Sequence, residues 1–348
     1  MYKSSLYIGC GFLLLYSGYN ALQTLLPLER PTVGPLTIAL SYVAYSLAAL
    51  ILPASTPLLR RCALTISAIT FVFWIWATTQ QDWVLAVASV LNGAGAGVLW
   101  TTEGAWLASI TSEVPEQAGR VSSIVLVCFH AATIAGQLSA HYLQAFYWQA
   151  LLTAGLATLL FLCAPNAWLG CGQSHGWYKF KALVSSPWLE QLAAIVLFGW
   201  TSALIWVGMP EYLADQLVWG YCAFAATSVV TFLIAGWVVD RWPRRYLVWL
   251  ACGLHCMLWG FVATVEAESA LAIGCMAVAG LANSLLNQTI VHWQMTMIEA
   301  ELRPSAFAAQ VFVYCLAYAS GAALVAWQIR LLLWQTACFA LLPIYFAN

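Results

Sequence analysis

Apolar runs of about 20 residues, separated by short polar turns, repeat along the whole chain. A helix needs about 20 mostly apolar residues to cross a bilayer, because every backbone polar group must be satisfied within the segment. We therefore predict twelve transmembrane helices, with loops too short for a soluble domain. Cutting at charges, prolines and polar turns places them at 4–27, 36–59, 62–79, 83–110, 119–143, 147–164, 189–213, 219–239, 245–264, 269–298, 305–325 and 327–346.

The one long connection lies almost at the middle of the chain and carries His175, Lys179 and Lys181. Six predicted helices precede it and six follow it. The sequence therefore predicts an N-terminal six-helix bundle at 1–164, a central cytoplasmic linker at 165–188 and a C-terminal six-helix bundle at 189–348.

The distribution of basic residues predicts the orientation, because Lys and Arg concentrate in short loops on the cytoplasmic side. Arg30 would lie on the opposite side, and Arg330 lies near the start of the last helix. We therefore expect both termini on the cytoplasmic side, in a membrane that the sequence does not identify. That side would hold Lys3, Arg60, Arg61, Arg120, Lys179, Lys181, Arg241, Arg244, Arg245 and Arg303.

The composition agrees with an integral membrane protein and narrows its partners. Hydrophobic residues make up 63% and charged residues 7%, whereas soluble domains carry roughly a quarter charged residues. A net charge of -1 without a long basic cluster argues against nucleic acid. Cys252, His255 and Cys256 share a helix turn, but two thiols and one imidazole leave a metal site incomplete. We expect no metal and no cofactor.

A charged motif lies between the eighth and ninth predicted helices: Gly236 is followed by Asp240, Arg241, Arg244 and Arg245. Glycine allows two helices to approach closely, and the acid at a helix end can pair with Arg244 or Arg245. We predict a latch that holds neighbouring helices in one conformation. The alternative is a charged turn that only obeys the positive-inside rule.

This spacing resembles the signature loop G-x3-D-R-x2-R-R of the major facilitator superfamily. The run from Gly11 through Gln23 resembles the first helix of its Unc-ninety-three-like branch, and Gly93 to Gly104 resembles that branch's glycine-rich helix. The resemblance implies an all-α major facilitator fold and a protein that is not an enzyme. It also implies that helices 1, 4, 7 and 10 line a central cavity near the bilayer midplane.

Glu103 is an acid inside an apolar segment, on one helical stripe with Asn92, Ala96 and Trp100. An ionised carboxylate in a membrane costs roughly 2.5 kcal/mol or more on insertion scales, so Glu103 must face protein or water. Protonation of such a group could change which conformation is lower in free energy, as a proton-coupled carrier requires. Alternatively, Glu103 only bonds to the neighbouring bundle or lies near the cytoplasmic end.

The second half offers His292 as a partner, on a polar stripe that includes Gln288. Aligning Pro115 with Pro304 brings Glu103 onto His292, and a slip of one residue would replace His292 with Val291 or Trp293. We hypothesise that Glu103 and His292 face one cavity and exchange a proton or hold a substrate hydroxyl.

Other candidate binding residues are Asn20 and Gln23 in the first helix and Trp206 in the seventh. Amides and aromatic rings suit a neutral polar organic ligand. His130 and His255 are interpreted as buried hydrogen-bonding residues. Haem binding through a histidine is a further alternative, although no attachment motif is present.

The sequence therefore predicts a secondary transporter of a small neutral polar solute, working by alternating access in the lipid bilayer, with proton coupling as an option. The alternative is a non-transporting subunit that acts as scaffold, chaperone or regulator of another membrane complex. This alternative stays open because the Unc-ninety-three-like branch, which the chain resembles, includes such members. In addition, the first-half loop Pro57 to Arg61 lacks the glycine and the acid of the motif.

Overall fold

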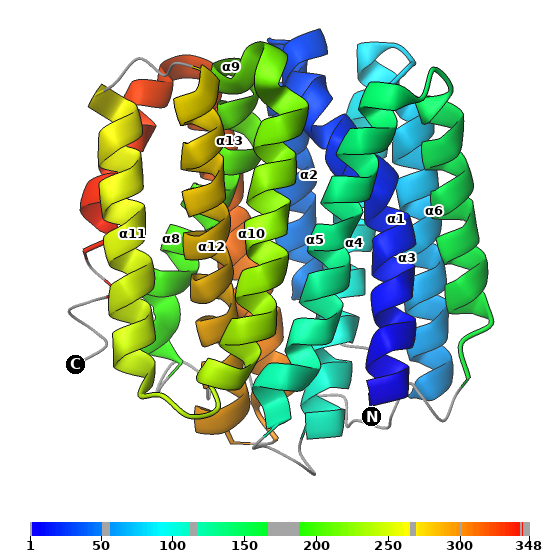
Figure 1. Cartoon of the computed structure of the whole chain (residues 1–348). Helices are drawn as coiled ribbons and strands as arrows, with labels where there is room; N and C mark the ends of the chain where they lie inside the picture. Colours follow the sequence, from blue (N-terminus) through cyan, green and yellow to red (C-terminus); the bar gives the residue numbers. More distant parts are fainter. Residues whose placement is uncertain are drawn as a thin grey trace.

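The first part of the chain forms six helices that run alternately up and down (Figure 1). The computed structural model describes residues 2–50, 56–111, 117–165, 188–264, 269–299, 301–341 and 343. The six helices are α1 (Tyr2–Glu29), α2 (Val33–Ala49), α3 (Pro57–Ala77), α4 (Asp82–Thr111), α5 (Ala118–Tyr142) and α6 (Phe146–Leu162).

The later part begins with a helix whose geometry changes along its length. It consists of η3 (Leu189–Gln191), α8 (Leu192–Ala203), the π-helical turn η4 (Leu204–Gly208), α9 (Met209–Leu213) and η5 (Ala214–Gln216). The elements that follow are α10 (Leu217–Val238), α11 (Arg244–Thr264), α12 (Ser269–Met297) and α13 (Arg303–Phe339).

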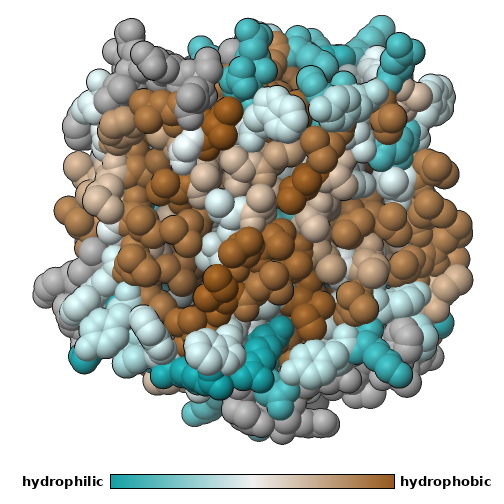
Figure 2. Space-filling view, in the orientation of Figure 1, coloured by the Kyte–Doolittle hydropathy of each residue, from teal (hydrophilic) through white to brown (hydrophobic). Residues whose placement is uncertain are grey.

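The outer surface matches a bilayer. Within the described residues, eight helices are long and apolar enough to cross a membrane, and α2 and α6 are shorter apolar helices. Figure 2 shows hydrophobic side chains across the middle of one face and hydrophilic ones at its upper and lower edges. The protein is therefore a multi-pass integral membrane protein. Helix α1 is not among the eight, and its buried face carries Ser17, Asn20, Gln23 and Thr24.

Most predicted segments coincide with helices, but the boundary between the second and third is wrong. The prediction runs the second helix to residue 59, whereas α3 already begins at Pro57. Thr56 caps α3 by accepting a hydrogen bond from the Leu59 amide, and proline suits the first helical position because it needs no amide partner. Of the predicted linker at 165–188, residues 166–187 lie outside the described residues.

The last helical element also differs from the prediction of two helices at 305–325 and 327–346. The structure assigns α13 as one element of 37 residues. The sequence around residues 325–330, VAWQIR, contains no glycine or proline that would break the helical pattern. α13 packs against α2, α8 and α11.

Two helix pairs join the first six helices to the later ones. Helix α5 packs against α1 and α10, while α2 packs against α4 and α13. The glycine-rich part of α4 makes the close packing of α2 on α4 possible, because a Cβ at Gly93 would lie 1.9 Å from the Ser41 carbonyl oxygen of α2. The α5–α10 and α2–α13 pairs flank a central space that opens between the two sets of helices.

Candidate functional site

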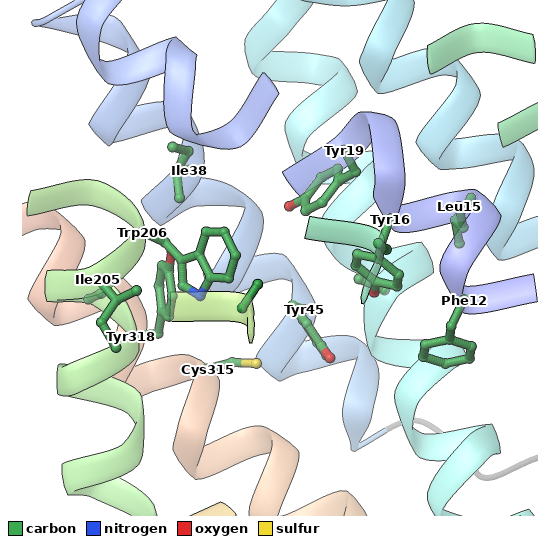
Figure 3. Packing of buried hydrophobic residues seen from close by; sticks show 14 of the residues in the cluster. Phe12, Leu15, Tyr16, Tyr19, Ile38, Tyr45, Ile205, Trp206, Cys315 and Tyr318 are labelled. Carbon is green, nitrogen blue, oxygen red and sulfur yellow. The ribbon is translucent and has the colours of Figure 1, made fainter. Parts of the chain in front are cut away.

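A central cavity of about 130 Å³ lies between the two sets of helices. Its walls come from α1, α2, α3, α4 and α5 on one side and from α8, η4, α12 and α13 on the other. Figure 3 shows Tyr16 of α1 on one side of this region, with Trp206 and Tyr318 on the other. The polar or titratable side chains in the lining, apart from the tyrosines and tryptophans, are Asn20, Gln23, Glu103, Ser122, His130, Ser202, Asn283, Asn287 and Gln310.

Glu103 is the acidic side chain among the described residues that line this cavity. It is only 7% exposed, and within the described part of the chain neither a hydrogen bond nor an ion pair reaches its carboxyl group. Trp100 and Leu107, one helical turn away on either side, also line the cavity. Phe307 of α13 packs against Gly104, whose added Cβ would lie 2.8 Å from the ring. Glu103 is thus a buried carboxyl group at an aromatic wall.

Trp100 is fixed by one hydrogen bond and several ring contacts. Its Nε1 donates to the Tyr16 hydroxyl at 2.7 Å. The rings of Phe12 and Phe129 meet the indole edge-on, with centroid distances of 4.9 and 5.4 Å. These contacts hold the indole beside the cavity, three residues before Glu103.

Trp206 enters the cavity wall from the π-helical turn η4. A π turn widens the helix locally and often occurs at functional sites, because it re-aims the side chains at its centre. The Tyr221 hydroxyl donates to the Ile205 carbonyl group, and the Tyr221 ring stacks on Trp206 at 5.4 Å. The turn and Tyr221 therefore position Trp206 together.

Toward the later end of α1, which lies at the top of Figure 1, contacts between aromatic and amide side chains link the two sets of helices. Gln23 of α1 donates through Nε2 to the Tyr318 hydroxyl of α13 at 2.9 Å. Tyr42 of α2 stacks on the same Tyr318 ring, with centroids 3.6 Å apart. Tyr318 is fully buried, so both contacts exclude water at this position.

At the lower end, Asp240 joins the turn after α10 to the start of α5. Its Oδ1 accepts the Gly119 amide at 3.2 Å and lies 3.4 Å from His292 Nε2. Its Oδ2 lies 3.9 Å from Arg120 Nε, and the Asp240 side chain is 5% exposed. A buried carboxylate is thus held by groups from α5 and α12.

The same contact brings two glycines together. A Cβ at Gly236 would lie 2.9 Å from the Gly119 carbonyl oxygen and 2.1 Å from Ser123 Oγ. Gln288 of α12 donates through Nε2 to that Gly119 oxygen at 2.8 Å and to Ser122 Oγ at 3.0 Å. We call Gly119, Arg120, Gly236, Asp240, Gln288 and His292 the lower latch.

A sequence profile of the Major Facilitator Superfamily matches residues 8–322. The chain belongs to the major facilitator superfamily. It is also 30% identical over 132 residues to mouse Protein unc-93 homolog A, a match that covers 36% of this chain and 28% of that protein. This partial match agrees with the resemblance to the Unc-ninety-three-like branch.

Solved structures share the fold of this superfamily member at low sequence identity. The human organic anion transporter MFSD10 (TETRAN) matches with a TM-score of 0.76 and 14% identity, over 99% of both chains. A bacterial homologue of the iron transporter ferroportin, in an outward-facing state, matches with a TM-score of 0.69 and 14% identity. That match covers 99% of this chain and 98% of the other. At this level of identity the likeness shows a shared fold along the whole chain.

The structure brings five of the predicted binding residues to the cavity and places two elsewhere. The five are Asn20, Gln23, Trp100, Glu103 and Trp206. His292 and Gln288 belong to the lower latch, so the hypothesis that His292 faces Glu103 across the cavity is wrong. Val291, one residue earlier, lines the cavity instead.

The predicted partners of Asp240 also need correction, because neither Arg244 nor Arg245 pairs with it. Arg244 lies 3.6 Å from Glu190 and 4.5 Å over the Trp293 ring. Arg245 lies over Tyr246 at 5.0 Å, and Arg241 over Trp237 at 3.8 Å. The three arginines therefore engage neighbouring side chains, while the acid points to α5.

Several residues of the site were not predicted. Gly119 enters the prediction only as the first residue of the helix at 119–143, and Arg120 only as one of the basic residues on the cytoplasmic side. The tyrosines of α2 and α13 are not among the predicted residues either, although spacings of three in Tyr42–Tyr45 and four in Tyr314–Tyr318 place each pair on one helix face. That spacing was the available signal for an aromatic wall on α2 and α13.

Proposed function

We propose that the protein is a secondary active transporter that carries a small organic solute through the central cavity by alternating access. In this proposal twelve spans form two six-helix bundles, 1–164 and 189–348, joined by a cytoplasmic linker at 165–188, and α13 supplies the last two spans, the first of them at Arg303–Val325. Both termini lie on the cytoplasmic side, so the lower end of Figure 1 faces the cytoplasm.

The cavity carries this proposal, because it lies between contacts that link the bundles at both ends. The Gln23–Tyr318 bond lies toward the upper end and the Asp240–Gly119 bond at the lower end. Each contact joins a helix of the first bundle to a helix of the second. Breaking one while keeping the other would open the cavity to one side only, as alternating access requires.

Glu103 is the candidate for proton coupling. Ionising a carboxyl group at this depth is costly unless a positive charge or water compensates it. Binding or releasing a proton at Glu103 therefore changes the free energy of each conformation, by an amount that depends on how much water reaches the carboxyl group in that conformation. In proteoliposomes with an imposed pH gradient, we expect Glu103→Gln to abolish solute-linked proton flux. The exposed Glu211 gives the matched control, because Glu211→Gln makes the same change outside the cavity.

Distances between labelled residues test alternating access directly. Spin labels at exposed Leu58 and Met297 report the lower end, and labels at Trp83 and Trp219 report the upper end. We expect two populations at each end, with the lower distance long when the upper one is short. The cysteines that would also take label must first be replaced by serine: the exposed ones among the described residues, Cys10, Cys62, Cys163 and Cys338, and Cys171, which lies outside those residues.

The same measurement separates the transporter from a non-transporting scaffold. A scaffold needs only one arrangement of the two bundles, so both label pairs would show a single distance that no imposed gradient changes. That result, together with co-purification of a stoichiometric membrane partner, would contradict the transporter proposal.

A further inference from the structure

We infer that the cavity binds a small organic cation whose ammonium group lies at Glu103 and whose apolar body lies among aromatic rings. This inference deepens the proposed function and rests on it for transport, although binding can be tested separately. Three observations support it: the charge of the lining, its ring content and its size.

The charge of the lining favours a cation. Among the described lining residues Glu103 is the acid, and neither lysine nor arginine is present. Its carboxyl group has no protein partner within the described residues and is more than nine-tenths buried. A desolvated carboxyl group either takes up a proton or is held ionised by a compensating positive charge, and an anionic ligand would add repulsion to its ionised form.

Neither of the basic groups near this wall, His130 and Arg60, forms an ion pair with Glu103. His130 lies between the rings of Phe224 and Phe232, at 5.6 and 5.2 Å, and is 4% exposed, where charging it would be costly. Arg60 lines a separate cavity of about 10 Å³ that Glu103 also touches. Arg60 donates to Ser109 Oγ at 3.5 Å and forms no ion pair with Glu103. Among the described residues that line the central cavity, no basic side chain pairs with the Glu103 carboxyl group.

The ring content suits the rest of such a ligand. Aromatic faces attract a cation within about 6 Å of the ring centre, and a set of rings around an ammonium group is a recurring recognition site. Trp100 precedes Glu103 by one turn of α4, and the Phe307 ring of α13 packs against the next residue, Gly104. Eleven Phe, Tyr and Trp rings of the described residues line the cavity, among them those of Tyr16, Trp100, Trp206 and Phe307.

The size of the cavity limits the ligand. A water molecule needs roughly 10–15 Å³ by the same measure, so 130 Å³ admits an organic molecule of roughly ten non-hydrogen atoms. Amide groups of Asn283, Asn287 and Gln310 on the opposite wall leave room for one or two polar substituents on its body. A monoamine with one aromatic ring fits these limits.

Three probes of nearly equal size and shape separate the charge classes. Phenyltrimethylammonium is a permanent cation, methyl phenyl sulfone is neutral and benzenesulfonate is an anion. We expect only phenyltrimethylammonium to raise the unfolding temperature of the purified full-length protein and to quench its tryptophan fluorescence in a saturable manner. Glu103→Gln should weaken its binding by roughly 100-fold, because a buried charge pair loses one partner, whereas Glu211→Gln should leave it unchanged.

Glu103→Asp keeps the charge and should recover part of the affinity, which excludes a folding defect as the cause of the loss. Tighter binding of benzenesulfonate or of the sulfone, or saturable binding of none of the three, would overturn the inference. Counterflow of labelled phenyltrimethylammonium in proteoliposomes then tests the proposed function by itself. Binding without counterflow would support the cation site and contradict the transporter, whereas counterflow of the anion alone would support a transporter and contradict the cation site.

Discussion

His292 Nε2 lies 3.4 Å from Asp240 Oδ1, and the same oxygen accepts a hydrogen bond from the Gly119 amide. One carboxylate thus joins α12 and the α10–α11 turn, both in the second half of the chain, to the first turn of α5. Because Gly119 and Arg120 come from the first half, the contact holds the two sets of helices together at the lower end. His292 contacts the acid and is not among the described residues that line the central cavity.

Replacing Asp240 should therefore open the lower end. Asp240→Ala removes the acceptor of the Gly119 amide, and a hydrogen bond to a charged group contributes about 1.5–3 kcal/mol. We expect at least a tenfold shift toward the long distance between labels at Leu58 and Met297. Asp215→Ala, at an exposed acid of η5, is the control and should leave the distribution unchanged. An unaltered distribution in Asp240→Ala would show that the latch does not bear on the conformation.

Close packing of two glycines predicts a second effect at the same contact. In Gly236→Ala the new methyl group would meet the Gly119 carbonyl oxygen at 2.9 Å, so α5 and α10 must separate. Overpacking of this kind costs about 1–3 kcal/mol, and we expect a lower unfolding temperature together with the long lower-end distance. Gly253→Ala adds the same methyl group where no atom of the described residues beyond the local helix backbone lies within 4 Å, and it should be neutral or stabilising. Equal effects of the two substitutions would contradict the packing argument.

The helices could largely be predicted from sequence because membrane burial imposes one simple constraint, an apolar run of sufficient length. That constraint does not fix where a helix starts, as Thr56 and Pro57 show: the capping residue and not the hydropathy sets the first turn of α3. Nor does it reveal the π turn at Leu204–Gly208, which depends on contacts such as that between Tyr221 and Ile205.

The site was harder to predict, because it depends on which helix faces which. Glu103 stands out within its own segment, but the sequence indicates its partner in the second half only through the alignment of Pro115 with Pro304. Val291, and not His292, lines the cavity, and a shift of one residue rotates a helical position by about 100°. In the same way the spacing of Asp240 to Arg244 suggested a local pair, whereas the acid makes its bond across the interface, to Gly119.

The upper end should respond in the opposite direction to the lower latch. Tyr318→Phe keeps the stacked ring but removes the hydroxyl group that accepts from Gln23, leaving a buried amide without its partner at a cost of about 1–3 kcal/mol. We expect the distance between labels at Trp83 and Trp219 to lengthen and the lower distance to shorten. Tyr142→Phe, at an exposed tyrosine, is the control. A shift of both ends in the same direction would point to general loosening and not to alternating access.

Trp100 and Tyr16 should prove energetically coupled. Their hydrogen bond of 2.7 Å lies at the cavity wall, and each ring also has other aromatic neighbours, so Trp100→Phe and Tyr16→Phe each remove the bond while keeping most packing. Once one partner is lost, removing the second has no bond left to break. The double variant should therefore be less destabilised than the sum of the two single variants, by about 1 kcal/mol in the free energy of unfolding. Combining Tyr16→Phe with Trp259→Phe, whose indole bonds to His255 in α11, should give additive effects. Additive effects in the Trp100–Tyr16 pair as well would show that the indole is held by its ring contacts alone, and the wall beside Glu103 would then tolerate any aromatic residue at this position.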